Sequence, residues 1–116
     1  MRKLVIHRER ALACFAMKYH CIVGRERESF LAQLGEQGPG IHLWDGDEPT
    51  LQNGQTLSLQ IGEEAVSFFV VACLDGRDLA TEEVNIPVGE EDVYYTVRTD
   101  FDGDKRLGIH LLPTER

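Results

Sequence analysis

The chain has no long run of apolar residues. No stretch of its 116 residues nears the roughly 18 apolar residues of a membrane-spanning helix, so no membrane insertion is expected. The segment most like a signal peptide, ALACFAM at residues 11–17, is too short and lacks a processing site. These features predict a cytoplasmic protein, with export after removal of a signal peptide as the alternative.

Cysteine is scarce and shows no disulfide or metal-binding spacing. Cys14, Cys21 and Cys73 are odd in number and form no CxxC motif. We expect buried, reduced thiols, because cysteine packs as a small hydrophobic residue. A disulfide or a metal site is the alternative. Reduced thiols agree with a cytoplasmic location.

Catalytic motifs are missing as well. Ser29, Ser58 and Ser67 lie in no nucleophile-elbow motif, and the glycine-rich GEQGPG at 35–40 lacks the Lys-Ser or Lys-Thr of a phosphate loop. A hydrolase built on two carboxylates, the third hypothesis for this chain, would need a pair ~5–9.5 Å apart in a cleft. The sequence predicts no enzyme, no catalytic residues and no cofactor.

The acidic clusters and the histidines are the candidate metal ligands. The segment Asp100–Asp104 is similar to part of a calcium loop, but its glycine is misplaced and position twelve is Leu111 rather than glutamate. We interpret it as a turn. The histidines at positions 7, 20, 42 and 110 share no short spacing, and His110 is expected to face Thr96 on the solvent side. No metal site is expected.

The net charge of −8 is unevenly distributed. Residues 1–30 contain seven Lys or Arg and three Glu, a balance of +4, which leaves −12 for the other 86 residues. An acidic protein is repelled by phosphate backbones, so nucleic acid is not expected as a partner. We expect the basic side chains to lie on solvated strand faces, with a local basic patch as the alternative.

What the chain does contain is alternation of apolar and polar residues, clearest in the segment EDVYYTVRTDFDGDKRLGIHLLP. The Asp-Gly pair in it marks a turn. A three-residue turn at Asp102–Asp104 pairs Val97 with Ile109 and Asp100 with Arg106, whereas a two-residue turn sets apolar residues opposite polar ones. We predict a hairpin with the three-residue turn.

Further strands are predicted from the same alternation and from the turn residues between them. They are Lys3–His7, Leu12–Val23, a strand around Ile41, Leu43 and Trp44, a strand with Leu57, Leu59 and Ile61, and an edge strand at Thr81–Val88. Ala65–Leu74 is nearly all apolar, so we expect a central strand buried on both faces. Seven or eight short strands predict a single all-β domain, residues 1–116, folded as a two-sheet antiparallel sandwich.

Residues 25–50 interrupt this pattern. Phe30, Leu31 and Leu34 have helical spacing, and Gly35 is a suitable C-cap. A short strand is the alternative. We favour one or two helical turns near 26–34.

Several motifs resemble those of a known group of domains. They are Ile6-x-Arg8-x-Arg10, Tyr19-x-x-Ile22-x-Gly24, Leu51-x-Asn53-Gly54-Gln55-Thr56 followed by Leu57-x-Leu59-x-Ile61-Gly62, and Glu91-x-x-Tyr94-x-x-Val97. The pattern resembles small bacterial immunoglobulin-like β-sandwich domains of uncharacterised function. The chain departs from it at Glu64, where those domains carry a histidine, and at 25–50, which looks like an insertion. The resemblance implies an immunoglobulin-like sandwich and no activity.

Trp44 is the most suggestive single residue for ligand binding. It is the only tryptophan and stands beside Asp45 and Asp47 in the acidic segment that continues to Glu48. Sandwich proteins can stack a sugar on an exposed aromatic ring while carboxylates accept hydrogen bonds from its hydroxyls. The alternative is that Trp44 is a buried or edge-covering residue, as most tryptophans are.

Together these features favour a non-enzymatic binding module. The expected partner is another protein or a second copy of the chain, with the basic surface of one molecule meeting the acidic surface of the next. The alternative is a carbohydrate-binding module that uses Trp44 with Asp45 and Asp47.

Overall fold

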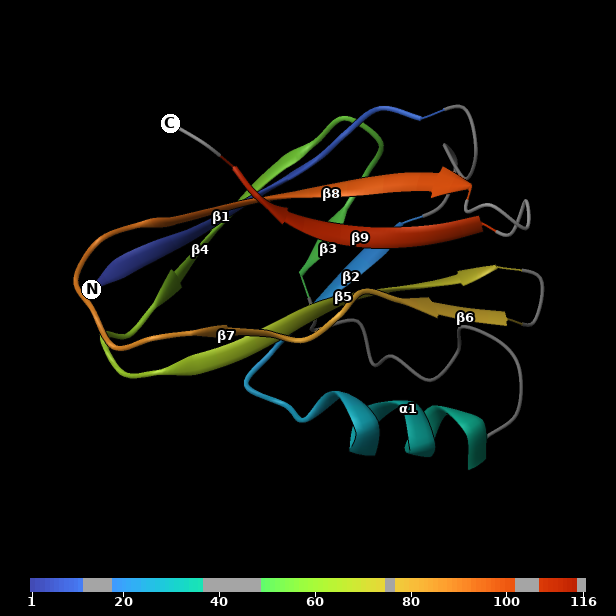
Figure 1. Ribbon diagram of the computed structural model, residues 1–116, viewed down its shortest axis with the longest axis horizontal. Coiled ribbons are helices and arrows are strands. Elements are labelled where there is room, and N and C mark those ends of the chain that lie inside the picture. Colours follow the sequence, from blue (N-terminus) through green and yellow to red (C-terminus); the bar gives the residue numbers. More distant parts are fainter. Residues whose placement is uncertain (12–17, 37–48, 75–76, 102–106, 115–116) are drawn as a thin grey trace.

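The computed structural model describes residues 1–11, 18–36, 49–74, 77–101 and 107–114, and these form a sandwich of two β-sheets with one helix (Figure 1). The elements in chain order are β1 (Arg2–Arg8), β2 (Tyr19–Val23), α1 (Arg27–Glu36), β3 (Thr50–Leu51), β4 (Thr56–Ile61), β5 (Val66–Leu74), β6 (Arg77–Ala80), β7 (Val84–Ile86), β8 (Val93–Phe101) and β9 (Leu107–Pro113). The prediction of an all-β, two-sheet sandwich is confirmed.

The first sheet has the strand order β4-β1-β8-β9. Its ladders are antiparallel except for the one between β1 and β8, which is parallel. The second sheet has the order β3-β2-β5-β6, and β7 also pairs with β5. β6 pairs with the second half of β5, and β7 pairs with its first half. The two short strands therefore follow one another along the same edge of the long strand β5.

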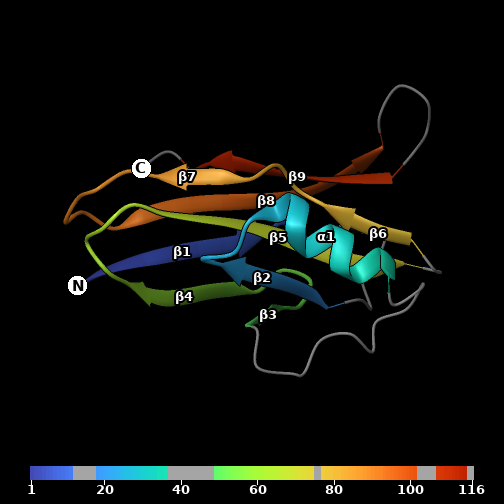
Figure 2. The same cartoon turned by 90° about the horizontal axis from the view of Figure 1, so that it is seen from below.

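β5 is the central strand that its apolar run predicted. Phe68, Val70 and Ala72 belong to the core between the two sheets, whereas Phe69 and Val71 are buried on the opposite face. Helix α1 covers that opposite face of the second sheet (Figure 2). A strand covered on both faces can be apolar at successive positions, which explains the lack of alternation here.

Helix α1 confirms the helical reading of residues 26–34 and extends it to Glu36. Its anchor is Phe30, whose ring packs edge-on against Phe69 with 5.5 Å between the centroids. The N-terminus of the helix is capped by the segment between β6 and β7, because the amide of Arg27 donates to a carboxylate oxygen of Glu83 at 2.8 Å. The Arg27 side chain donates to the carbonyl of Thr81, so the helix is tied to the segment between β6 and β7.

The predicted register of the C-terminal hairpin is wrong by two residues. Val97 pairs with Leu111 rather than Ile109, and Asp100 faces Gly108 rather than Arg106. A shift of two keeps every side chain on its predicted face. The three-residue turn required Asp104 near the left-handed region that disfavours a Cβ. The ladder instead continues to a pair between Phe101 and Leu107, and residues 102–106 lie outside the described part.

Several strand limits also differ from the predictions. β1 is one residue longer at each end than Lys3–His7, β6 was not predicted, and the strand expected at Thr81–Val88 is confined to Val84–Ile86, which ends before Pro87. The turn at Asn53-Gly54 is confirmed, with Gly54 at φ 79°. Asp75-Gly76, most of Leu12–Val23 before β2, and the strand expected around Ile41, Leu43 and Trp44 lie outside the described residues.

A polar cluster links the two sheets through the core. The hydroxyl groups of Tyr19 on β2 and Thr99 on β8 are hydrogen-bonded at 2.6 Å. The guanidinium carbon of Arg8 on β1 lies 3.5 Å from the centroid of the Tyr19 ring, and its Nη1 donates to the carbonyl of Leu51 on β3. Four strands at one end of the sandwich, β1, β2, β3 and β8, are therefore joined by hydrogen bonds and a cation–π contact as well as by apolar packing.

We expect Tyr19→Phe to lower the free energy of unfolding by about 0.5–1.5 kcal/mol, because it removes the hydroxyl bonded to Thr99. Thr99→Val removes the other partner. Since both changes break one bond, the double variant should lose less than the sum of the two single losses. Urea unfolding of the four proteins measures this coupling, and strictly additive losses would show that the bond does not stabilise the fold.

Candidate functional site

The inward face of β1 begins and ends with an arginine. Arg2, Leu4, Ile6 and Arg8 alternate with outward residues, and Arg2 and Arg8 are 3% and 0% exposed. The prediction that the basic residues of the N-terminal segment lie on solvated faces is wrong for these two. Burial of a guanidinium is favourable only when its donors find acceptors.

Arg2 meets this requirement with backbone carbonyls from two other segments. Its Nε donates to the carbonyl of Gly62 at 3.0 Å, and its Nη2 donates to those of Glu64 at 3.1 Å and Pro87 at 2.7 Å. Gly62 and Glu64 belong to the β4–β5 connection and Pro87 to the β7–β8 connection. One side chain thus holds the two connections together.

Gly89 completes the arrangement because it allows the chain to approach Arg2 closely. A Cβ at this position would lie 3.2 Å from Nη1 of Arg2, tighter than an ordinary contact. The amide of Gly89 also donates to the carbonyl of Glu63 at 3.0 Å, a direct bond between the two connections. The local backbone around Arg2 is therefore fixed from both sides.

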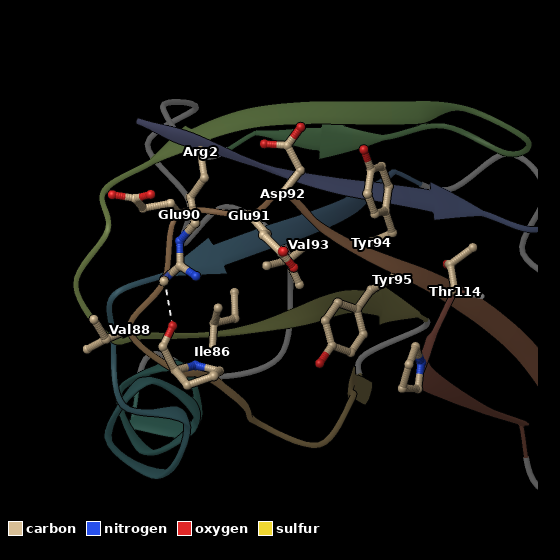
Figure 3. A pocket seen from close by; sticks show the side chains of 13 residues that line it. Arg2, Ile86, Val88, Glu90, Glu91, Asp92, Val93, Tyr94, Tyr95 and Thr114 are labelled. Carbon is tan, nitrogen blue, oxygen red and sulfur yellow. Dashed lines mark hydrogen bonds between the residues drawn. The ribbon is translucent and has the colours of Figure 1, made fainter. Parts of the chain in front are cut away.

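A groove opens beside Arg2, between the β7–β8 connection and the end of β9 (Figure 3). We call it the Arg2 groove. Its volume is about 660 Å³, within the range of roughly 300–1,000 Å³ that is usual for ligand sites. It is lined by Arg2, Ile86, Pro87, Val88, Gly89, Glu90, Glu91, Asp92, Val93, Tyr94, Tyr95, Pro113 and Thr114.

The apolar and acidic groups of the groove come from different parts of it. Ile86 is buried, and the ring of Tyr95 packs edge-on against Phe68 in the core, with 5.3 Å between the centroids. Glu90 and Glu91 are exposed, as is Asp92, whose carboxylate accepts a hydrogen bond from the amide of Lys3. The groove therefore has an apolar base and an acidic rim.

The residues that the sequence suggested for ligand binding are not part of this groove. Trp44, Asp45 and Asp47 lie outside the described residues, so the structure does not place them. Asp100 lies on β8, opposite Gly108, and the rest of the acidic turn is outside the described part. In the described ranges, no three or more His, Cys, Asp or Glu side chains are grouped as metal ligands.

The described histidines are dispersed over the molecule. His7 bonds to the hydroxyl of Thr56, and His110 lies 3.3 Å from a carboxylate oxygen of Glu82. His110 is exposed, as predicted, but it pairs with Arg98 rather than Thr96. Partial burial and, to a smaller extent, the charge of Lys18 lower the pKa of His20.

Sequence reasoning missed Arg2 and the chain around Gly89. The sequence did contain a signal for Arg2. Side chains at alternate positions of a strand point to the same face, so Arg2 must face inward if Leu4 and Ile6 do. The groove itself had no such signal, because its walls come from β1, residues 86–95 and the end of β9, which the folded topology alone brings together.

In comparisons with known proteins, no family model, no curated protein and no solved structure matches the chain. Across the described residues, helix α1 included, no helix has the length and apolar character needed to cross a membrane.

Cys21 is buried in the core with 1% of its surface exposed, and burial raises the pKa of its thiol to about 12. The unfolded thiol ionises near 9.0, so the stabilisation from a neutral folded thiol is complete below that pH and is lost as the pH rises toward 12. The difference in unfolding free energy between wild type and Cys21→Ala should therefore shrink over this range in denaturant titrations. A constant difference would contradict the burial of an un-ionised thiol.

We expect Arg2→Met to lower the free energy of unfolding by about 1–3 kcal/mol, because methionine keeps an apolar stem but leaves three carbonyls without their donor. Lys3→Met, an exposed neighbour on the same strand, is the matched control and should change stability by about 0.5 kcal/mol or less. Hydrogen exchange of the Gly89 amide should accelerate in Arg2→Met only. Equal stability of the two variants would show that Arg2 does not hold the connections.

Proposed function

We propose that this chain is a non-enzymatic binding module and that a segment of a partner protein docks in the Arg2 groove. The observation that carries the proposal is the groove itself, whose walls are held by the three hydrogen bonds of Arg2 and whose edge exposes an apolar side chain. Val88 lines the groove and is 74% exposed. A fixed, partly apolar groove needs little reorganisation on binding, which favours affinity.

The polar groups of the groove support binding rather than bond-making. A carboxyl that serves as general acid is typically set in an apolar pocket, whereas Glu90, Glu91 and Asp92 are exposed to solvent. The Arg2 side chain donates its hydrogen bonds to backbone carbonyls and so stabilises the fold. The carboxylate-based hydrolase therefore gains no support from this arrangement.

The partner is either a different protein or a second copy of this chain. Self-association through a basic N-terminal surface is less favoured than the charge count suggested, because two of its seven cations, Arg2 and Arg8, are buried. The carbohydrate-binding alternative depends on Trp44 and stays a prediction.

The proposal is tested by selecting displayed random peptides on the immobilised protein. We expect enriched peptides whose binding is lost by at least about tenfold in Val88→Ser, since burying a valine side chain is worth ~1.5–3 kcal/mol. Gln60→Ser, an exposed change on β4 away from the groove, is the control and should bind as wild type does.

Two results would contradict the proposal. One is the absence of any enriched peptide, together with a monomer in sedimentation. The other is binding that is equal in Val88→Ser and Gln60→Ser, which would place the docking surface elsewhere.

A further inference from the structure

The end of the sandwich that carries the Arg2 groove is acidic. Its carboxylates come from the β4–β5 connection and from the β7–β8 connection, and all are exposed: Glu63, Glu64, Glu90, Glu91 and Asp92. Both connections lie at the same end as the N-terminus (Figure 1). Arg2 and Lys3 are the cationic side chains of β1 at this end, so the side-chain charges of five carboxylates and two cations sum to −3.

The acidic end is also where apolar surface is exposed. Among the described residues, the large apolar side chains that are exposed are Val88, at 74%, and Met1, at 84%. Val88 lies in the Arg2 groove, and Met1 lies in a neighbouring hollow with Gly62, Glu63 and Glu64. Arg2 lines the first hollow and donates to the carbonyls of Gly62 and Glu64, which line the second. In the Arg2 groove Val88 lies with Ile86, Pro87 and Tyr95, and an apolar patch with a polar rim is typical of a surface that another molecule covers.

A cationic peptide segment fits both features. Lysine and arginine have apolar stems that can pack on Val88 and the tyrosine rings, while their charged ends reach the carboxylates of the rim. An apolar residue of the same segment would occupy the base formed by Ile86 and Pro87. An acidic or phosphorylated ligand would meet repulsion from the rim instead.

The shape of the groove agrees with a short extended segment. β7 pairs with β5, and Ile86 at the end of β7 lines the groove. β9 ends opposite Tyr95, two residues after the start of β8, so the groove begins where this ladder stops. The volume of about 660 Å³ accommodates a few side chains and not a folded domain.

We infer that the Arg2 groove binds an extended, lysine- or arginine-containing segment of a partner protein, with an apolar residue of that segment packed beside Val88. This inference rests on the proposed function and adds the chemistry of the partner. Cationic side chains supply selectivity and speed of association, and the apolar contact supplies most of the affinity.

The first test is the composition of the peptides selected on the wild-type protein. We expect them to contain lysine or arginine on either side of an apolar residue. A synthetic representative is then compared by fluorescence anisotropy with a version in which every lysine and arginine is replaced by serine. The replaced peptide should bind at least about tenfold more weakly, and the difference should diminish as salt is raised.

The second test assigns the selectivity to the rim. Glu90→Gln/Glu91→Gln should weaken binding of the cationic peptide about fivefold. Glu26→Gln/Glu28→Gln also removes two negative charges, but at the start of helix α1 and outside the groove lining, and should leave binding unchanged. All four positions are exposed, so neither variant is expected to unfold.

The outcomes separate this inference from the proposed function. If selected peptides bind in a Val88-dependent way but are neutral or acidic, or if the two double variants bind equally, the cationic partner is wrong and the binding module remains. If no peptide binds and the protein is a monomer in sedimentation, or if neutral oligosaccharides bind in a Val88-dependent way in place of peptides, both are overturned.

Discussion

The structure depends on the need of two buried arginines for hydrogen-bond acceptors. Arg2 and Arg8 mark the two ends of the inward face of β1, with Leu4 and Ile6 between them. A buried guanidinium with unmet donors is costly, so the chain around each one must supply carbonyl groups or an aromatic face. The acceptors come from the second sheet and from the connections to it. β1 is thereby bonded, at one end, to the connections that lead to and from the second sheet and, at the other end, to β3 of that sheet.

The same requirement produces the groove. Arg2 draws the β4–β5 and β7–β8 connections toward one point, and Gly89 lets them come close enough to bond to each other. The acidic residues that follow Gly89, Glu90–Asp92, have exposed side chains. An element that stabilises the fold therefore also creates an acidic rim over an apolar base.

The sequence predicted the elements better than their arrangement. The alternation in β4 and β8 and the apolar run of β5 reflect how many faces of each strand are covered, and this is a local property. The register of the β8–β9 hairpin was wrong by two residues because the alternation is unchanged by such a shift. The break between β6 and β7 was not predictable from propensity. At that point the hydroxyl of Thr81 accepts a ladder hydrogen bond from the amide of Val70, so a side chain replaces a backbone partner.

The candidate site was largely beyond sequence reasoning. The inward position of Arg2 could be read from the alternation along β1, but no sequence motif marks Val88, Glu90 or Thr114. These residues line one groove only because the ends of β7, β8 and β9 lie close together in the fold. Trp44 with Asp45 and Asp47, which had the stronger local signal, stays a prediction. Adjacency in the chain is visible in a sequence, whereas adjacency in space depends on the topology.

The parallel pairing of β1 with β8 has a consequence for the order of folding. Leu4 lies beside Val93, so the second ladder of β1 needs the closure of a loop that includes most of the chain. Contacts at such long sequence separation are characteristic of proteins that fold in milliseconds to seconds rather than microseconds. A ribosome must release the chain as far as Val93–Val97 before β1 gains its second neighbour. The acidic end, built on both of these strands, is therefore among the last parts of the molecule to acquire its native shape.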